Sequence, residues 1–165
     1  MTGPADMALE ALDRAGLDAA HVRLLSAARN RASIYLPVMD AGVLESDEVH
    51  TELRRLATSG RAARIRILTH DANRAHRDGH RLIALSQRLP TAVSIRVPTD
   101  ETHLHYGSAF TTADDAGAYL FRPVFSRFEA EGSLDALGQT SRLLAYFDEV
   151  WERAEPAWEI RPLGI

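Results

Sequence analysis

The chain has 165 residues, of which 45% are hydrophobic and 25% charged, and these values are ordinary for one soluble globular domain with a sizeable core. Its formal net charge is −4, which argues against a dedicated duplex-DNA-binding protein, since such proteins carry a strongly basic face. Cysteine and lysine are both absent, so disulfides, thiolate metal sites, cysteine nucleophiles and lysine chemistry are excluded.

The first predicted elements follow a short N-terminal lead-in. We assign residues 1–16 to this lead-in and residues 17–165 to a single domain. Asp18 is a suitable N-cap for a first helix. A short apolar strand over residues 32–36 comes next, and Pro37 stops it.

The clearest helical pattern begins after Ser46. Ser46 is a suitable N-cap, the two acids that follow it favour the positive end of the helix dipole, and Gly60 marks the stop. Apolar residues recur at helical spacing between these two signals: Val49, Leu53, Leu56 and Ala57. The pattern predicts an amphipathic helix that packs on the core.

Two strands with a helix between them form the middle of the chain. The strands cover residues 64–68 and 93–97, and in both of them apolar side chains alternate with polar ones. The helix covers residues 75–89, and Pro90 marks its end. Because a strand–helix–strand unit normally connects parallel strands, we expect at least two parallel strands in the sheet.

The C-terminal part of the pattern contains a hairpin and a helix. Residues 107–113 and 118–122 read as strands joined by the turn sequence DDAG, in which Asp begins the turn and Gly supplies a positive φ. Residues 123–138 are irregular, and a last helix covers about 139–154. We therefore expect an α/β fold with a mixed, mainly parallel sheet that is flanked by helices and followed by a C-terminal hairpin and helix.

Several stretches of the chain resemble one half of a phospholipase D-type domain. The segment LRRLATSGRAARIRILTHD, the strand VSIRV and the hairpin SAFTTADDAGAYLF follow the order of elements in that fold. The phrases GHRLIALSQRLP, AYLFRP and FDEVWERAEP resemble a bacterial domain family with a phospholipase D-like fold, over about residues 22–162. That family occurs alone or fused to acetyltransferase domains and has no established activity, so the resemblance implies mainly a fold.

The resemblance also identifies where a catalytic motif would lie. Phospholipase D-type enzymes use H-x-K-x-x-x-x-D, whose histidine attacks phosphorus while the lysine stabilises the transferred charge, followed by a Gly-Ser-x-Asn-like step. Counted back from Asp114, the histidine position holds Gly107, the lysine position holds Ala109, and Arg122 stands at the Gly-Ser step. Asp114 alone matches as a vestigial motif position, and it equally suits a turn. Because losing the nucleophile removes most of the rate enhancement, we predict a non-catalytic domain that acts as a binding or regulatory module.

Seven histidines support an alternative, a histidine- or metal-dependent hydrolase or phosphodiesterase. His76 and His80 are four residues apart and could bind a metal from one helical turn, and His103 and His105 could share one strand face. His70 ends a strand, where ligand sites of α/β proteins commonly lie. The simpler interpretation is that these histidines are solvated or locally hydrogen-bonded and hold no metal.

Five arginines are candidates for an anion site or for structural roles. Arg64 and Arg66 share one side of a strand, and Arg96 has the same phase on an expected neighbour. These three could lie on a solvent-exposed face, pair with acids of the last helix, or belong to an anion site or subunit interface. Arg122 and Arg127 stand near the phosphate position of the parent fold, and their alternative is an ordinary salt bridge. A cleft that joined Arg122 to the histidines would favour the hydrolase.

The sequence also leads to expectations about the partners and the cellular location of the protein. Phospholipase D-type halves pair across a near-twofold axis, so we expect a homodimer, and the apolar tail around Trp158 could contribute contact area. An acetyltransferase-type partner is implied by analogy, and we expect no cofactor. Binding of single-stranded nucleic acid or a nucleotide through the arginine face is a third, less favoured function, which Arg66→Ala or Arg96→Ala would abolish. No stretch approaches the roughly 18 apolar residues of a membrane span. Residues 1–10 contain no basic residue, so we expect no secretory signal and a cytoplasmic location.

Overall fold

One mixed sheet of eight strands organises the computed structural model, which describes residues 4–113 and 117–160. The strands are β1 (Ala8–Ala11), β2 (Arg31–Tyr35), β3 (Arg64–Leu68), β4 (Val93–Val97), β5 (Ala109–Ala113), β6 (Ala118–Arg122), β7 (Ala130–Ser133) and β8 (Glu155–Pro156). Their order across the sheet is β1-β7-β6-β5-β2-β3-β4-β8.

The α/β class predicted from the sequence is confirmed, but the description of the sheet as mainly parallel needs correction. Among the described strands, only the β2–β3 and β3–β4 neighbours are parallel. The other five neighbouring pairs are antiparallel. The error arose because β1, β7 and β8, which all pair antiparallel, are two to four residues long and too short to be recognised as strands from the sequence.

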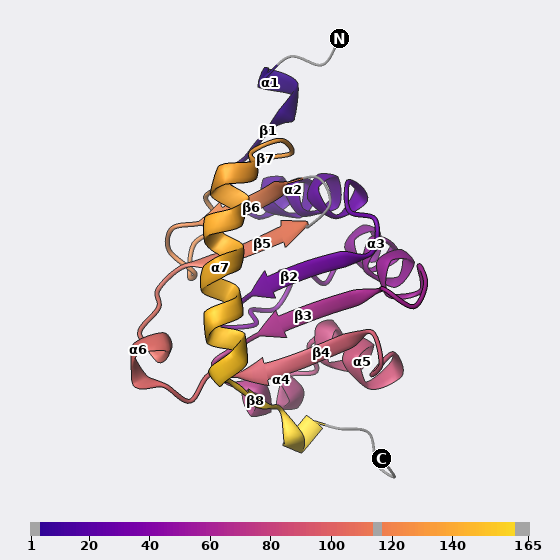
Figure 1. Cartoon of the computed structure of the whole chain (residues 1–165), viewed down its shortest axis with the longest axis vertical. Helices are drawn as coiled ribbons and strands as arrows, with labels where there is room; N and C mark the ends of the chain where they lie inside the picture. Colours follow the sequence, from indigo (N-terminus) through magenta and orange to yellow (C-terminus); the bar gives the residue numbers. More distant parts are fainter. Residues whose placement is uncertain (1–3, 114–116, 161–165) are drawn as a thin grey trace.

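Helices cover both faces of the sheet. They are α1 (Pro4–Met7), α2 (Arg14–Ser26), α3 (Asp47–Ala57), α4 (Ala72–Arg77), α5 (Arg81–Arg88), α6 (Glu101–Leu104) and α7 (Leu137–Arg153), with a 3-10 turn, η1 (Trp158–Ile160). Figure 1 shows α7 lying across one face of the sheet, with α2, α3, α4 and α5 behind the other face. None of the helices within the described ranges is long and apolar enough to cross a lipid bilayer.

The two faces of the sheet have different cores. On the face behind α7, Tyr35, Leu68 and Phe110 pack against Phe147 and Val150 of α7, so this core is largely aromatic. On the opposite face the buried residues are mainly aliphatic and come from the sheet and from α2, α3 and α5: Leu17, Leu24, Ile34, Leu53, Ile65, Ile67, Leu82 and Leu120. Because neighbouring residues along a strand point to opposite faces, adjacent side chains such as Phe121 and Arg122 belong to different cores.

The helix expected after Ser46 is confirmed. Ser46 caps α3 by accepting a hydrogen bond from the Val49 N–H at 3.2 Å, and the predicted apolar stripe of α3 is buried. The helix ends at Ala57, and Gly60 adopts a φ of 146° in the turn that follows. Strands β3 and β4 also have the predicted bounds.

The helix predicted over residues 75–89 is instead two helices, α4 and α5. Gly79 adopts a φ of 71° between them, a conformation that ends one helix and favours glycine. His80 then caps α5, because its Nδ1 accepts the Leu82 N–H at 3.2 Å. The apolar spacing of the two helices is nearly continuous, so periodicity alone did not reveal the break.

The N-terminal region differs from the expected lead-in. Residues Ala8–Ala11 form the edge strand β1, which pairs with β7 and buries Leu9 and Ala11. Asp13, rather than Asp18, caps α2 by accepting the Gly16 N–H at 2.7 Å. The domain boundary at residue 17 remains a prediction, although β1 belongs to the same sheet as the rest of the chain.

Candidate functional site

The positions of the phosphoryl-transfer motif lie at the start of β5. Gly107 is exposed, and a Cβ added there would meet no heavy atom within 4 Å. Ala109 is 1% exposed and pairs with Arg122 of β6, so both side chains point to the aliphatic face of the sheet. Asp114 lies outside the described residues. Among the residues the structure describes, this position therefore offers one cation, Arg122, and no nucleophilic histidine.

Arg122 is buried and binds the segment that follows it. Its Nε donates to the Arg127 carbonyl at 3.0 Å, and its Nη2 donates to the Phe125 and Arg127 carbonyls at 2.7 Å each. Burial lowers the pKa of Arg122 and nearby Asp40 raises it, but a guanidinium stays charged at neutral pH. These contacts hold residues 123–127 in a loop and support a structural role for Arg122. The side chain of Arg127 is exposed beside this loop.

His21 of α2 is a buried neighbour of Arg122 that the sequence analysis did not single out. Its side chain is 3% exposed, and burial, followed by the charge of Arg122, lowers its pKa to about 3. The imidazole is therefore neutral at pH 7. A signal was available in the sequence, because His21 lies four residues after Leu17 and three before Leu24, in the apolar stripe of its helix.

The three strand arginines whose role was left open have different environments. Arg66 pairs with Asp148 of α7 at 2.8 Å, donates to the Ser33 hydroxyl at 3.0 Å and lies over the Phe147 ring. Arg96 donates a hydrogen bond to the Trp151 backbone carbonyl at 2.8 Å, and its guanidinium carbon lies 4.4 Å from the centre of the Trp151 side-chain ring. Arg64 is exposed and donates to backbone carbonyls next to it. For Arg66, pairing with an acid of the last helix is thus the explanation that the structure supports.

Arg66 and Arg96 are both in contact with α7, although their role as anion-binding residues remains a prediction. The helix supplies a carboxylate to one of them and an aromatic face to both. Cation–π contacts and a charged hydrogen bond stabilise a guanidinium that is partly removed from water. These two arginines therefore help to attach α7 to the sheet.

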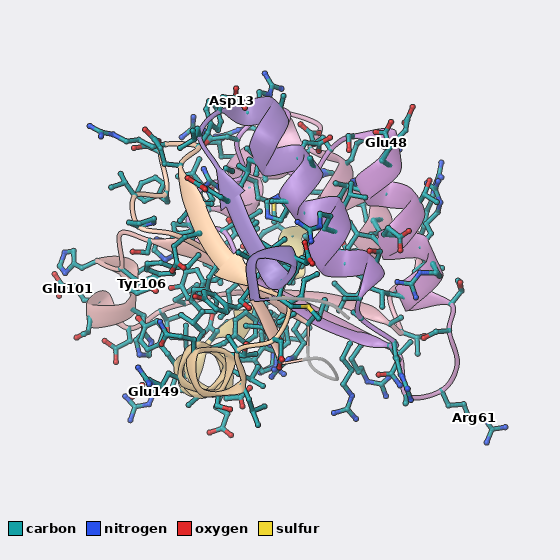
Figure 2. The ribbon with its side chains drawn as sticks, turned by 90° about the horizontal axis from the view of Figure 1, so that it is seen from above. Asp13, Glu48, Arg61, Glu101, Tyr106 and Glu149 are labelled. Carbon is teal, nitrogen blue, oxygen red and sulfur yellow. The ribbon has the colours of Figure 1, made fainter. Side chains whose placement is uncertain are left out.

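The aromatic face ends in a cluster at the carboxyl edge of β2 and β3. The Tyr35 hydroxyl lies 3.0 Å from Nε2 of His70 and 3.4 Å from the His103 carbonyl. Both contacts are satisfied when Nε2–H of His70 donates to the phenol and the phenol donates to the carbonyl. Burial, with Tyr146 and Tyr106 nearby, raises the pKa of Tyr35 above its usual range, so the phenol stays protonated. Figure 2 shows Tyr106 on the side of the molecule where α6 and α7 lie.

His70 also lines a polar cavity of about 200 Å³. The cavity lies between the start of α4 and the segment that contains β8 and η1, and its polar lining residues are Asp71, Asn73, Thr99, Glu155 and Glu159. Burial lowers the pKa of His70, which keeps the imidazole neutral at pH 7. The arrangement could hold a small polar molecule beside a neutral histidine.

The other histidines do not join His70 in this cavity. His80 is buried, with Nε2 donating to the Val43 carbonyl at 3.0 Å and Nδ1 accepting from Leu82, so its two ring nitrogens are used in the fold. His76 and His105 are exposed, and His103 is buried beside Tyr146. Within residues 4–113 and 117–160, no group of three or more His, Asp or Glu side chains is arranged to hold a metal.

Arg122 and the His70 cluster lie on opposite faces of the sheet. The backbone register places Phe121 beside Phe110 and Tyr35 on the aromatic face, whereas Arg122 faces the aliphatic core with Ala109. The cleft that would have favoured a hydrolase, with Arg122 and the histidines together, is therefore not formed by the described residues.

Residues 13–163 match a family model described as a domain of unknown function, DUF7931. The comparison with curated proteins found no match.

Solved structures with a similar fold include Nuc, NucT and a chromatin protein. Nuc from Salmonella typhimurium, a phospholipase D family member, has a TM-score of 0.58 at 9% identity, over 84% of this chain and 89% of its own. NucT from Helicobacter pylori has a TM-score of 0.59 at 13% identity, over 87% of this chain and 92% of its own. TrmBL2, an archaeal chromatin protein with a novel mode of DNA binding, has a TM-score of 0.58 at 12% identity and covers 90% of this chain. The chain spans only 54% of TrmBL2, and at these identities the likeness shows the phospholipase D-like fold alone.

Proposed function

The chain belongs to the DUF7931 family and has a phospholipase D-like fold, and on this premise we propose that it is a non-catalytic domain that acts as a binding or regulatory module. The observation that carries the proposal is the state of the motif position. Gly107 and Ala109 replace the nucleophile and its cation, and Arg122 donates its described hydrogen bonds to two loop carbonyls. A phosphoryl-transfer site needs a free nucleophile and a cation directed at the phosphate.

Restoring the motif tests this proposal. We expect Gly107→His to change the free energy of unfolding by less than about 0.5 kcal/mol, because the position is exposed and open. Ala109→Lys should cost roughly 3 kcal/mol, because its ammonium would enter the aliphatic core. Urea unfolding of the two single variants measures both effects.

The double variant Gly107→His/Ala109→Lys addresses the chemistry. We expect no hydrolysis of bis(p-nitrophenyl) phosphate by this variant or by the wild type, because the loop held by Arg122 still fills the place of the Gly-Ser step. Turnover by the wild type that disappears in Arg122→Gln would contradict the proposal. Turnover that appears only in the double variant would show that the site has kept its phosphate-binding geometry and that the loop does not block it.

The module would act on a partner, and a second copy of the chain is the first candidate. Support comes from Leu12, which directly follows the edge strand β1 and is 74% exposed, and from Val124, which is 43% exposed. A groove of about 410 Å³ runs beside β1 and is lined by Leu9, Leu12 and Pro123 among others. Sedimentation analysis of the wild type and Leu12→Glu tests a homodimer at this edge. An acetyltransferase-type partner remains an analogy with fused relatives.

A second candidate function, a hydrolase that uses His70, is favoured by one observation. Among the histidines first considered for catalysis, His70 is a neutral imidazole that lines a cavity with acidic and amide groups, and Tyr35 holds its ring at 3.0 Å. Such a histidine could act as a general base without a metal. Esters and phosphodiesters should be turned over by the wild type and not by His70→Gln if this candidate is right, with His105→Gln as the matched exposed control. Activity that survives His70→Gln would exclude it.

A further inference from the structure

An apolar groove lies between α3 and α5, away from the motif position and from the His70 cavity. Its volume is about 390 Å³, within the range of small-molecule sites. The residues that line it come from α3 and its C-cap and from α5 and its C-cap: His50, Arg54, Thr58, Arg81, Ala84, Leu85, Arg88 and Leu89. The groove therefore combines an apolar floor from α5 with arginines from both helices.

Two of the three arginines on the rim are free to bind a ligand. Arg54 and Arg88 are exposed, and no carboxylate within the described ranges lies at salt-bridge distance from either of them. Arg81 differs, since its Nη1 donates to Asp47 at 2.9 Å and to the Glu45 carbonyl at 2.8 Å. With respect to the part of the chain that the structure describes, Arg54 and Arg88 thus form an unneutralised pair of cations on one groove.

The surface around this pair is also basic. The three segments 24–31, 53–64 and 84–92 contain no Asp or Glu, but they contain seven arginines: Arg29, Arg31, Arg54, Arg55, Arg61, Arg64 and Arg88. Of these, Arg55 pairs at 2.8 Å with Glu52, which directly precedes the second segment. Contacts join the first two segments, because the Arg64 N–H donates to the Asn30 carbonyl and Arg55 Nη2 donates to the Leu25 carbonyl. Figure 2 shows Arg61 at the edge of the molecule opposite Glu101. A chain with net charge −4 therefore concentrates positive charge at one edge.

The floor of the groove carries no charge to offset the rim. Leu85 is 5% exposed, Leu89 packs against the core, and Ala84 is exposed at the surface. His50 is buried behind them, with Nε2 2.8 Å from the Leu44 carbonyl. Burial, followed by the charges of Arg81 and Arg54, lowers the pKa of His50, so this imidazole is neutral at pH 7. A cationic rim over an uncharged apolar floor is complementary to an anion with an apolar body.

We propose that the groove between α3 and α5 binds a small amphipathic anion, with its apolar chain or ring on Ala84, Leu85 and Leu89 and its carboxylate or phosphate between Arg54 and Arg88. Two observations favour this ligand over a nucleic acid strand. None of the three basic segments contains Phe, Tyr or Trp, on which bases would stack. A phosphate backbone also has no apolar surface to bury against the floor of the groove, so this floor would not contribute to its binding.

Decanoate is a suitable probe, with two control compounds. Acetate has the carboxylate without the long apolar chain, and decanol has the chain without the charge. Titrated into the full-length protein below its micelle concentration, decanoate should bind at least about tenfold more tightly than either control compound. Backbone amide shifts in a nitrogen-15-labelled protein should concentrate on α3 and α5. The double variant Arg54→Gln/Arg88→Gln should bind decanoate about tenfold more weakly, or weaker still, since charged hydrogen bonds to the carboxylate are lost.

Matched variants separate the groove from a general charge effect. Arg74→Gln/Arg77→Gln removes two exposed arginines of α4, outside the groove, and should leave the affinity within about twofold. Ala84→Glu places a carboxylate on the exposed floor without burying it and should abolish binding while leaving the melting temperature unchanged.

Three results would overturn the inference. The first is equal affinity of decanoate for the wild type and Arg54→Gln/Arg88→Gln, and the second is equal binding of acetate and decanoate. The third is an unstructured single-stranded oligonucleotide that binds through Arg54 and Arg88 more tightly than decanoate does. None of these results bears on the motif position at β5, so the proposed loss of phosphoryl transfer stands or falls separately.

Discussion

Lowering the pH from 7 to 5 is expected to destabilise the folded domain by on the order of 2 kcal/mol through His21 alone. In the folded protein the pKa of His21 is lowered to about 3, by burial first and by Arg122 second, so the ring stays neutral. In the unfolded chain the same ring binds a proton below its ordinary pKa of 6.5. The unfolded state therefore binds more protons between pH 6.5 and about 3, and stability is lost as the pH falls through this window.

Urea unfolding at several pH values between 7 and 5 measures the effect. This range lies above the ordinary pKa of Asp and Glu, so carboxylates contribute little to the slope. Burial also lowers the pKa values of His50, His70 and His80, which adds to the loss in the same direction. His21→Leu should remove about one proton from the slope, whereas His105→Gln, at an exposed position, should leave it unchanged. A full wild-type slope in His21→Leu would show that His21 is not held neutral.

Replacing Arg122 by Met is expected to lower the free energy of unfolding by about 4 kcal/mol. Arg122 is 2% exposed and donates three hydrogen bonds to the carbonyls of Phe125 and Arg127. Methionine fills a similar volume but leaves both carbonyls without these donors. Arg122→Lys should recover little of the loss, because an ammonium cannot reproduce the planar fork that reaches both carbonyls.

Two controls make the Arg122 result specific. Arg127→Gln changes an exposed side chain and keeps the backbone carbonyl that Arg122 binds, so its cost should stay below about 0.5 kcal/mol. Arg122→Met should also raise the pKa of His21 in the folded protein, since the charge of Arg122 helps to lower it. If Arg122→Met instead left stability unchanged and abolished binding of inorganic phosphate, Arg122 would be an anion-binding residue and the structural role would be wrong.

Local signals in the sequence were sufficient for the elements with strong periodicity. The cap at Ser46, the apolar stripe to Ala57 and the alternation in RIRIL and VSIRV predicted α3, β3 and β4 with nearly correct bounds. These elements depend on side chains within one or two turns, or on one buried face. Strand β7, with the sequence AEGS, has no such signal, and it forms because β6 and β1 supply hydrogen-bond partners on both sides.

The candidate sites also divide into features that the sequence predicts and features that depend on the tertiary structure. The spacing of Gly107, Ala109 and Asp114 predicted where the motif would lie and which residues it lacks, because a linear motif is a property of the sequence. The sequence did not show that Arg122 binds its own loop, or that it lies on the face opposite His70. Those facts depend on which strand faces meet which helices, over separations of tens of residues.

The sequence alone thus determined the α/β class, the central strands and the absence of lysine, since each follows from local pattern or from composition. The loss of a phospholipase D nucleophile remains a prediction. Only the tertiary structure decided how the charged groups are used. Arg66 is paired with Asp148, Arg122 is bonded to carbonyls, and Arg54 and Arg88, over an apolar groove, have no carboxylate at salt-bridge distance among the described residues. The physical reason is that the role of an arginine is set by the acceptors and the solvent around it, and these come from distant parts of the chain.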